Sequence, residues 1–308
     1  LLSSTDSQTR PTASTFHSLG VRILRQHGPK IGIPSNFVIM DRRDSESLVK
    51  EINKELGFDN KQWSPGKTVN YIGNRRQGRA APIEQLETIR NRYNSLKKER
   101  DLVDFDDLIY RTVDLLQESD AAREALQNLW THVHVDEYQD TNRIQYELVK
   151  LLSLNHGNVC AVGDTDQTIY TWRGAEIKNL LQFEKDFSNT TTVLLEQNYR
   201  STQKIIAVAN DCITKNSTRI EKNLFTKNNE GENIDIFIGS DENDEARQIA
   251  REVKSLLANN VPASEIAILY RANYQSQALE KAFISAGVQY DLLGTKFYSR
   301  SEIKTMIS

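Results

Sequence analysis

Residues 133–142, "VHVDEYQDTN", combine a short apolar run with a dense run of acidic and amide side chains. The pattern favours a strand that delivers Asp136 and Glu137 at its carboxyl end, where ligands bind in open α/β sheets. One carboxylate can hold Mg²⁺, which prefers hard oxygen ligands, and the other can accept a proton from an attacking water. An acidic strand end that only caps the next helix is the alternative, but the polar run extends beyond what a cap needs.

A second stretch, 161–175, reads "AVGDTDQTIYTWRGA". Its lead-in, 158–164, is apolar throughout, as is typical of a strand buried on both faces of a parallel sheet. Gln167 can sense a γ-phosphate or orient a water, because its amide both donates and accepts hydrogen bonds. Tyr170, Trp172 and Arg173 predict a stacking surface with a cation, the chemistry that grips unpaired bases. For each aromatic alone, packing under a loop is the alternative.

A third stretch, "LLEQNYRS" at 194–201, places Tyr199 and Arg200 after another predicted strand, 190–198. Arg200 can neutralise the charge that develops during phosphoryl transfer. Tyr199 can stack on a nucleobase. An arginine at a strand end is, taken alone, more often the partner of an ion pair.

Strands and helices alternate along the chain, which predicts an α/β fold with parallel sheets. The sequence favours two α/β units joined near residue 201, with an α-helical insertion at roughly 24–104 and a loop or short helix at 60–82. Helices are predicted at 15–27, 44–56, 83–130, 143–152, 202–216, 242–259 and 276–287. Strands are predicted at 132–137, 158–164, 190–198, 234–240, 265–271 and 289–294.

The composition indicates a globular protein, with 38% hydrophobic and 26% charged residues among 308. No apolar run approaches the roughly 18 residues of a membrane span, and two cysteines make no disulfide framework, so a reducing cytoplasm is expected. The net charge of −3 excludes a surface coated in positive charge but not a local groove for nucleic acid. Basic residues dominate 75–100, where a solvated helix face is the simpler interpretation.

With "STFHS" (14–18), "VDFDDL" (103–108) and "EIAILYRANYQSQALE" (265–280), these stretches resemble the UvrD/PcrA/Rep family of superfamily 1 DNA helicases. The resemblance runs from about residue 14 to the end in the family's motif order, and is most similar to the PcrA type of Gram-positive bacteria. It implies RecA-like P-loop NTPase motor domains with helical insertions. It also implies an ATP-dependent 3′→5′ helicase of the DNA repair and replication type, in the bacterial cytoplasm.

The resemblance also assigns roles to residues of this chain. Asp136 is expected to coordinate Mg²⁺ and Glu137 to act as the catalytic base. Gln167 is expected to read the γ-phosphate of ATP, Arg200 to act as an arginine finger and Tyr199 to stack on adenine. The residues implied to contact single-stranded DNA are Thr15, Phe16, His17, Phe105, Tyr170, Trp172 and Arg173. The implied partners are single-stranded DNA, junctions of single- and double-stranded DNA, and repair or replication accessory proteins, with no membrane.

The domain limits implied by the resemblance place 1–23 and 105–200 in a partial first RecA-like domain and 24–104 in a DNA-binding helical insertion. Residues 201–295 would form the first half of the second RecA-like domain, and 296–308 the start of a junction to a second insertion. The family's P-loop and its last motifs are expected outside these residues, so the chain alone should hydrolyse little or no ATP. The alternatives are a helicase subunit of a recombination helicase–nuclease and a non-catalytic DNA-binding fragment.

The stretch "WSPGKTVNY", 63–71, contains the Gly-Lys-Thr that ends a nucleotide-binding P-loop. A P-loop also needs a glycine four residues before that tripeptide, where this chain has Lys61. No apolar strand leads in, and glycines break the segment that follows, so no clear helix is expected to begin at the threonine. We therefore predict that this tripeptide is not a P-loop. Lys67 is expected to lie in a solvated loop near the arginines of 75–79, close to duplex DNA.

Overall fold

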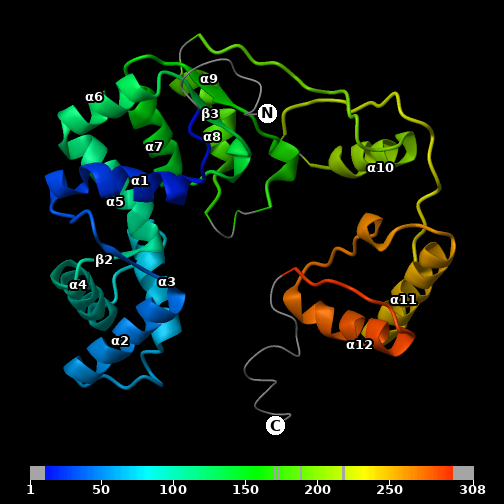
Figure 1. Ribbon diagram of the computed structural model, residues 1–308, viewed down its shortest axis with the longest axis horizontal. Coiled ribbons are helices and arrows are strands. Elements are labelled where there is room, and N and C mark those ends of the chain that lie inside the picture. Colours follow the sequence, from blue (N-terminus) through cyan, green and yellow to red (C-terminus); the bar gives the residue numbers. More distant parts are fainter. Residues whose placement is uncertain (1–10, 170, 172–173, 188, 217–218, 294–308) are drawn as a thin grey trace. The chain divides into compact units, whose positions relative to one another are not determined.

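The computed structural model describes residues 11–169, 171, 174–187, 189–216 and 219–293 (Figure 1). Tyr170, Trp172 and Arg173, which the sequence singles out for DNA contact, lie outside the described residues. The chain divides into two units, each described here by itself. The first comprises Leu1–Glu196 and Cys212–Asn223, and the second Gln197–Asp211 and Leu224–Ser308.

Helices pack around the largest hydrophobic cluster of the first unit. They are α1 (Phe16–His27), α5 (Phe105–Glu118), α6 (Asp120–Leu129) and α7 (Arg143–Ser153), and the turn η1 (Gly28–Ile31) follows α1. The helices predicted at 15–27 and 143–152 are therefore confirmed. Helix α1 lies so close to α5 that a Cβ atom at Gly20 would be 2.2 Å from the carbonyl oxygen of Leu108, so only glycine fits there.

A small parallel sheet in the same unit pairs β3 (Val133–Val135) with β4 (Val159–Ala161), in register Val133 to Val159. The short helices α8 (Ile177–Leu181) and α9 (Phe183–Asp186) follow in sequence. Tyr138 is fully buried beside Phe183, with ring centroids 5.5 Å apart. Cys160 of β4 is exposed, so the predicted burial of 158–164 on both faces is wrong for the described residues.

The helical part of the first unit contains α2 (Arg42–Leu56), α3 (Pro65–Arg76) and α4 (Glu84–Glu99), which share a second hydrophobic cluster. A parallel pair, β1 (Val38–Met40) and β2 (Leu102–Asp104), joins this part to α5. The helix predicted at 44–56 exists but begins earlier. Asp41 caps it and forms a reciprocal capping box with Asp44.

Helix α3 bears out the short-helix alternative predicted for 60–82 and corrects the predicted break after the tripeptide. It runs through Gly66 and Gly73, because Tyr71 and Ile72 are buried in the second cluster and offset the roughly 1 kcal/mol that each glycine costs a helix. Lys67 is exposed in the first turn of this helix rather than in a loop. No strand is assigned to the described residues 57–64 before it, as a P-loop would require.

The second unit contains most of α10 (Gln203–Ile213), together with α11 (Glu242–Ala258) and α12 (Ser276–Ala286). The helices predicted at 202–216, 242–259 and 276–287 are confirmed. Helices α11 and α12 pack against each other through Ala250, Val253 and Phe283. No helix of the described residues is both long and apolar enough to cross a bilayer.

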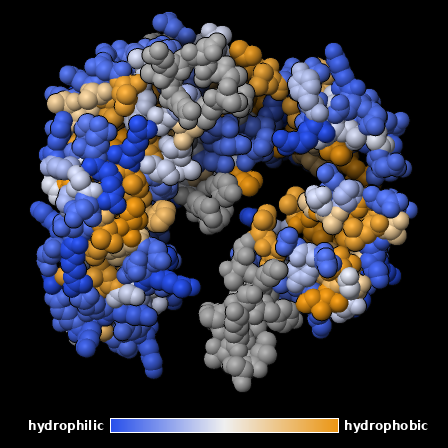
Figure 2. All heavy atoms as spheres, viewed as in Figure 1, coloured by the Kyte–Doolittle hydropathy of each residue, from blue (hydrophilic) through white to orange (hydrophobic). Residues whose placement is uncertain are grey.

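The strands predicted at 190–198, 234–240, 265–271 and 289–294 are not formed in the described part of the chain, which has only an isolated bridge between Gln197 and Phe225 there. Ile238 is 88% and Leu269 94% exposed, and Figure 2 shows hydrophobic residues at the surface of the second unit. A parallel strand forms its hydrogen bonds only with a neighbouring strand, and apart from this bridge no described segment pairs with these. These segments therefore have the apolar pattern of strands but lack the neighbouring strand that would complete a sheet.

Candidate active site

The first element of the site is the turn that follows strand β3. Asp136 and Glu137 come directly after Val135, and both are exposed. Glu137 has φ 51° and ψ 43°, a left-handed conformation that is uncommon outside glycine and is concentrated at functional sites. Its backbone N–H donates to Asp136 Oδ1 at 3.0 Å. This turn takes Glu137 out of the alternation of the strand and keeps both carboxylates at its carboxyl end.

Strand β4 brings the second predicted stretch to the same edge of the sheet. The Val162 N–H donates to the Val135 carbonyl at 2.8 Å, and the Tyr138 N–H donates to the Val162 carbonyl at 2.9 Å. A Cβ atom at Gly163 would lie 2.8 Å from Gln139 Oε1, so a larger residue here would displace the Gln139 amide. The structure therefore brings together the two polar stretches that the sequence placed at strand ends.

Gln139 joins these two strand exits and is 1% exposed. Its Nε2 donates to Glu137 Oε2 at 2.7 Å, and its Oε1 accepts from the Asp164 N–H at 2.9 Å. In the sequence, Gln139 is one of several polar residues in 133–142 and has no distinguishing pattern. No pattern within 133–142 could show that its partner lies 25 residues further along.

Gln167 lies at the end of a tight turn that Asp164 caps. Asp164 Oδ1 accepts from the Asp166 N–H at 2.9 Å, and Asp164 Oδ2 accepts from Gln167 Nε2 at 2.8 Å. The predicted phosphate-reading amide is thus hydrogen-bonded to an aspartate of its own turn.

Two cations, Arg219 and Lys222, hold the same turn from a segment to which the sequence assigned no role. Lys222 pairs with Asp164 and lies 3.4 Å from Asp166, and Arg219 lies 3.1 Å from Asp166. Burial opposes the ionisation of Asp164, but the hydrogen bonds from Lys222 and Gln167 outweigh it, so the pKa of Asp164 lies below its usual value. The ionised carboxylate of Asp164 therefore anchors the turn through its ion pair with Lys222.

The acids after β3 are different, because no described cation forms an ion pair with Asp136, Glu137 or Asp140. Asp140 Oδ1 is buried without a hydrogen-bond partner among the described residues. Burial raises the pKa of Asp140, and the nearby charge of Glu137 raises it further. No described group of three or more His, Cys, Asp or Glu side chains is arranged to hold a metal alone. The oxygen donors suit Mg²⁺ held by one or two carboxylates together with substrate phosphates.

A groove of about 900 Å³ lies between the helical part and the α1–α5–α7 core, with Phe105 and His17 in its lining. Phe105 is 54% exposed, and its ring centroid lies 5.3 Å from that of His17. Burial lowers the pKa of His17 although Asp106 opposes the shift, so the ring is neutral at pH 7. The pair therefore offers π-faces, which suit the stacking of unpaired bases.

Thr15 and Phe16 precede His17 in the chain and serve the fold. The Thr15 hydroxyl accepts from the Ser18 N–H at 3.3 Å and caps α1. Phe16 is half-buried against two hydrophobic clusters. Part of the predicted DNA-contacting stretch is thus used in capping and packing.

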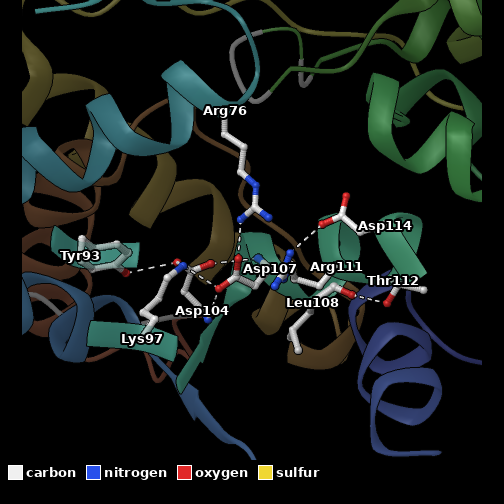
Figure 3. Close-up of polar contacts among 9 residues, drawn as sticks. All are labelled: Arg76, Tyr93, Lys97, Asp104, Asp107, Leu108, Arg111, Thr112 and Asp114. Atoms are coloured by element: carbon white, nitrogen blue, oxygen red, sulfur yellow. Dashed lines mark hydrogen bonds and ion pairs between the residues drawn. The ribbon is translucent and has the colours of Figure 1, made fainter. Parts of the chain in front are cut away.

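A buried ionic network holds the start of α5, the helix that begins at Phe105 (Figure 3). Asp104 and Asp107 form a reciprocal capping box at this helix terminus. Lys97 Nζ, on α4, bonds to both carboxylates, at 2.6 Å from Asp107 Oδ2. Arg76, at the end of α3, lies 2.5 Å from Asp107 Oδ1. The network, defined as Arg76, Lys97, Asp104 and Asp107, connects α3 and α4 to α5.

Burial and neighbouring charges shift the pKa values of Asp107 and Tyr93 in and beside this network. Burial raises the pKa of Asp107, but the charges and hydrogen bonds of Lys97 and Arg76 outweigh it and lower the pKa to about 2. Burial, and then the charge of Asp104, raise the pKa of Tyr93, whose hydroxyl lies 3.2 Å from Asp104 Oδ2. Each ionised group is therefore compensated inside the protein.

Most of the basic run at 75–100 is engaged in ion pairs, although Arg79, Lys98 and Arg100 are exposed, as a solvated helix face predicts. The pairs join Arg75 and Arg90 to Glu87, Arg76 to Asp107, Arg92 to Glu55 and Glu99, Lys97 to Asp104 and Asp107, and Arg100 to Glu51. Arg79 instead approaches Gly174, where a Cβ atom would lie 2.6 Å from its guanidinium. These pairs leave few of the run's charges for a ligand.

Tyr199 and Arg200 lie in the second unit, in an exposed turn before α10. Asn198 Oδ1 accepts from the N–H groups of Arg200 and Ser201, at 2.9 and 2.7 Å. Tyr199 is 78% exposed. The turn thus presents an aromatic ring and a guanidinium to solvent.

Comparisons with known proteins give this arrangement a family. The UvrD/REP helicase N-terminal domain matches residues 2–188, and the UvrD-like helicase C-terminal domain matches 193–308. The chain belongs to the UvrD/REP helicase family. It is also similar to the ATP-dependent DNA helicases PcrA of Staphylococcus aureus strain COL and of Staphylococcus epidermidis, at 41% identity over 307 residues in each case. The match covers 96% of this UvrD-like chain and 42% of the length of each relative.

Proposed function

We propose that the natural protein is an ATP-driven motor of the UvrD/REP type that moves 3′→5′ on single-stranded DNA and unwinds duplexes, in DNA repair or replication. One observation carries this proposal. The exits of β3 and β4 place Asp136 and Glu137, which no described cation pairs, beside the turn that holds Gln167. These acidic and amide groups at the carboxyl edge of a parallel sheet are one part of what binding and hydrolysis of a nucleoside triphosphate require.

Each residue of the site has a role in this proposal. Asp136 holds Mg²⁺, which neutralises charge on the phosphates when it is bound. Glu137 accepts a proton from the attacking water, and Gln167 contacts the γ-phosphate of ATP. Tyr199 stacks on the adenine, and Arg200 stabilises the charge that develops on the transferred group.

DNA contact is proposed for the groove beside α1 and α5. The rings of Phe105 and His17 stack on unpaired bases there, supported by the exposed fraction of Phe105. Thr15 and Phe16 flank them on α1. Contact of Tyr170, Trp172 and Arg173 with single-stranded DNA is proposed on the basis of the family resemblance alone. Junctions of single- and double-stranded DNA and repair or replication accessory proteins remain the proposed partners.

The proposed architecture is two RecA-like domains with a helical insertion at 24–104. No stretch of the 308 residues has the P-loop spacing of glycines before a Gly-Lys-Ser/Thr. We therefore expect the 308-residue chain by itself to hydrolyse little ATP, because the lysine that grips the β- and γ-phosphates in P-loop enzymes is not among its residues. Vigorous turnover by the isolated chain would contradict this expectation.

The test is ATP turnover by the natural, full-length protein with and without single-stranded DNA, followed by unwinding of duplexes with a 3′ or a 5′ single-stranded tail. We expect DNA-stimulated turnover and unwinding from the 3′ tail. Salt-sensitive DNA binding that ignores an ATP analogue, without turnover, would instead indicate a DNA-binding protein with no motor activity. Unwinding from the 5′ tail alone would contradict the proposed polarity.

A further inference from the structure

Gln139 is the buried group at the sheet edge to which the proposed function gives no role. Its amide is 1% exposed and lies between two partners of opposite kind. The carboxylate of Glu137 can only accept, and the backbone N–H of Asp164 can only donate. The orientation of the amide is therefore set by its neighbours, with Nε2 toward Glu137 and Oε1 toward Asp164.

The connection continues from Asp164 to Gln167. The N–H of Asp164 bonds to Gln139, while its Oδ2 accepts from Gln167 Nε2 at 2.8 Å. A continuous path of hydrogen bonds thus runs from the carboxylate of Glu137 to the amide of Gln167. Lys222 and Arg219 pair with Asp164 and Asp166 and hold the far side of the turn. The two groups that the proposed function assigns to water and to the γ-phosphate are mechanically joined.

We propose that Gln139 is a positioning residue that ties the carboxylate of Glu137 to the 163–167 turn, so that base and phosphate-contacting amide keep one mutual geometry. This inference rests on the proposed function. Only glutamine suits the place: glutamate loses the donor to Glu137, leucine loses donor and acceptor, and asparagine is shorter by one methylene. Gly163 has no side chain, which leaves room for the amide.

The first test measures the hydrogen bond between the Asp164 N–H and Gln139 Oε1 by hydrogen exchange of the Asp164 amide in the 308-residue chain. We expect slow exchange in the wild type and in Gln139→Glu, which keeps an acceptor for that amide. We expect clearly faster exchange in Gln139→Leu, which has none. The control is Gln127→Leu, because Gln127 is also buried and donates to the Leu151 carbonyl at 2.7 Å, away from this site. Unchanged protection of the Asp164 amide in Gln139→Leu would overturn the tie.

The second test measures the consequence in the natural, full-length protein with saturating single-stranded DNA. We expect kcat to fall about 10- to 100-fold in both Gln139 variants, as is usual when a partner that orients a reacting group is lost, with KM for ATP changed far less. Gln127→Leu should lower the unfolding midpoint as Gln139→Leu does but keep its kcat. Equal kcat in the two leucine variants would overturn this inference alone, whereas a wild type without ATP turnover would overturn the proposed function beneath it.

Discussion

Two groups of acids in the first unit differ in how their charges are compensated. Asp107 lies buried against Lys97 and Arg76, Asp104 lies half-buried against Lys97, and every charge has a partner in the protein. Asp136 and Glu137 lie exposed after β3 without an ion pair to a described cation. Acids with internal partners hold elements together, whereas acids without them are available to an external cation or a reacting proton. The comparison predicts that the first pair serves stability and the second serves chemistry.

The largest expected effect is that of Glu137→Gln on ATP turnover. We expect turnover by the natural protein to fall about 10²- to 10⁴-fold, the range for loss of a general base. Because the side chain is exposed, the free energy of unfolding should change by less than about 0.5 kcal/mol. DNA-stimulated turnover and a urea titration measure the two quantities. A variant that keeps wild-type turnover would remove Glu137 from the chemistry.

Lys97→Met tests the other side of the comparison. It leaves the buried Asp107 and the half-buried Asp104 with less compensation, so the free energy of unfolding should fall by about 3–5 kcal/mol in a denaturant titration. Lys98→Met is the matched control, because Lys98 is the next residue on α4 and is exposed. Similar unfolding free energies for the two variants would show that the network adds no stability.

The pH dependence of stability should follow Asp107. Its pKa is about 2 in the folded protein and 3.8 for the free side chain, so its contribution is present above about pH 4 and is lost as the pH falls toward 2. The shift corresponds to about 2 kcal/mol. Unfolding measured from pH 6 to 2 should show this decline in the wild type and a shallower one in Asp107→Asn. Parallel curves for the two proteins would contradict the assignment.

The smallest expected effect is that of Phe105→Ala on DNA affinity. Loss of one stacking ring costs about 1–3 kcal/mol per base, and we expect the lower end because Phe105 also packs against His17. Affinity for a labelled single strand should fall about fivefold, with little change in the unfolding midpoint. Phe237→Ala is the control, an exposed phenylalanine of the second unit. Equal affinities for the two variants would argue against a stacking role for Phe105.

The sequence predicted the helices better than the strands, for a physical reason. A helix such as α11 closes its hydrogen bonds within itself, so apolar spacing and a capping residue largely determine it. A strand such as the one predicted at 234–240 needs a neighbour, which no described segment supplies. For 60–82 the sequence left a loop and a short helix open, because the burial of Tyr71 and Ile72, which offsets the glycines of α3, is visible only in the tertiary structure.

The candidate site was predicted in part. Asp136, Glu137 and Gln167 could be placed at one edge because the carboxyl ends of parallel strands meet there. Gln139 and Lys222 could not, because their roles depend on contacts to Asp164 that are 25 and 58 residues distant in sequence. The sequence also could not show that Arg76 and Lys97 are paired with Asp107 and so are not free to bind DNA.

The most direct test of the central claim is to measure ATP turnover and the free energy of unfolding in parallel for Glu137→Gln and Asp107→Asn. The account predicts opposite patterns. Glu137→Gln should lose turnover and keep its stability, while Asp107→Asn should lose about 3–5 kcal/mol of stability and, at temperatures where it remains folded, keep most of its turnover. If Glu137→Gln unfolded as readily as Asp107→Asn, or kept its turnover, the distinction between structural and chemical acids would be wrong.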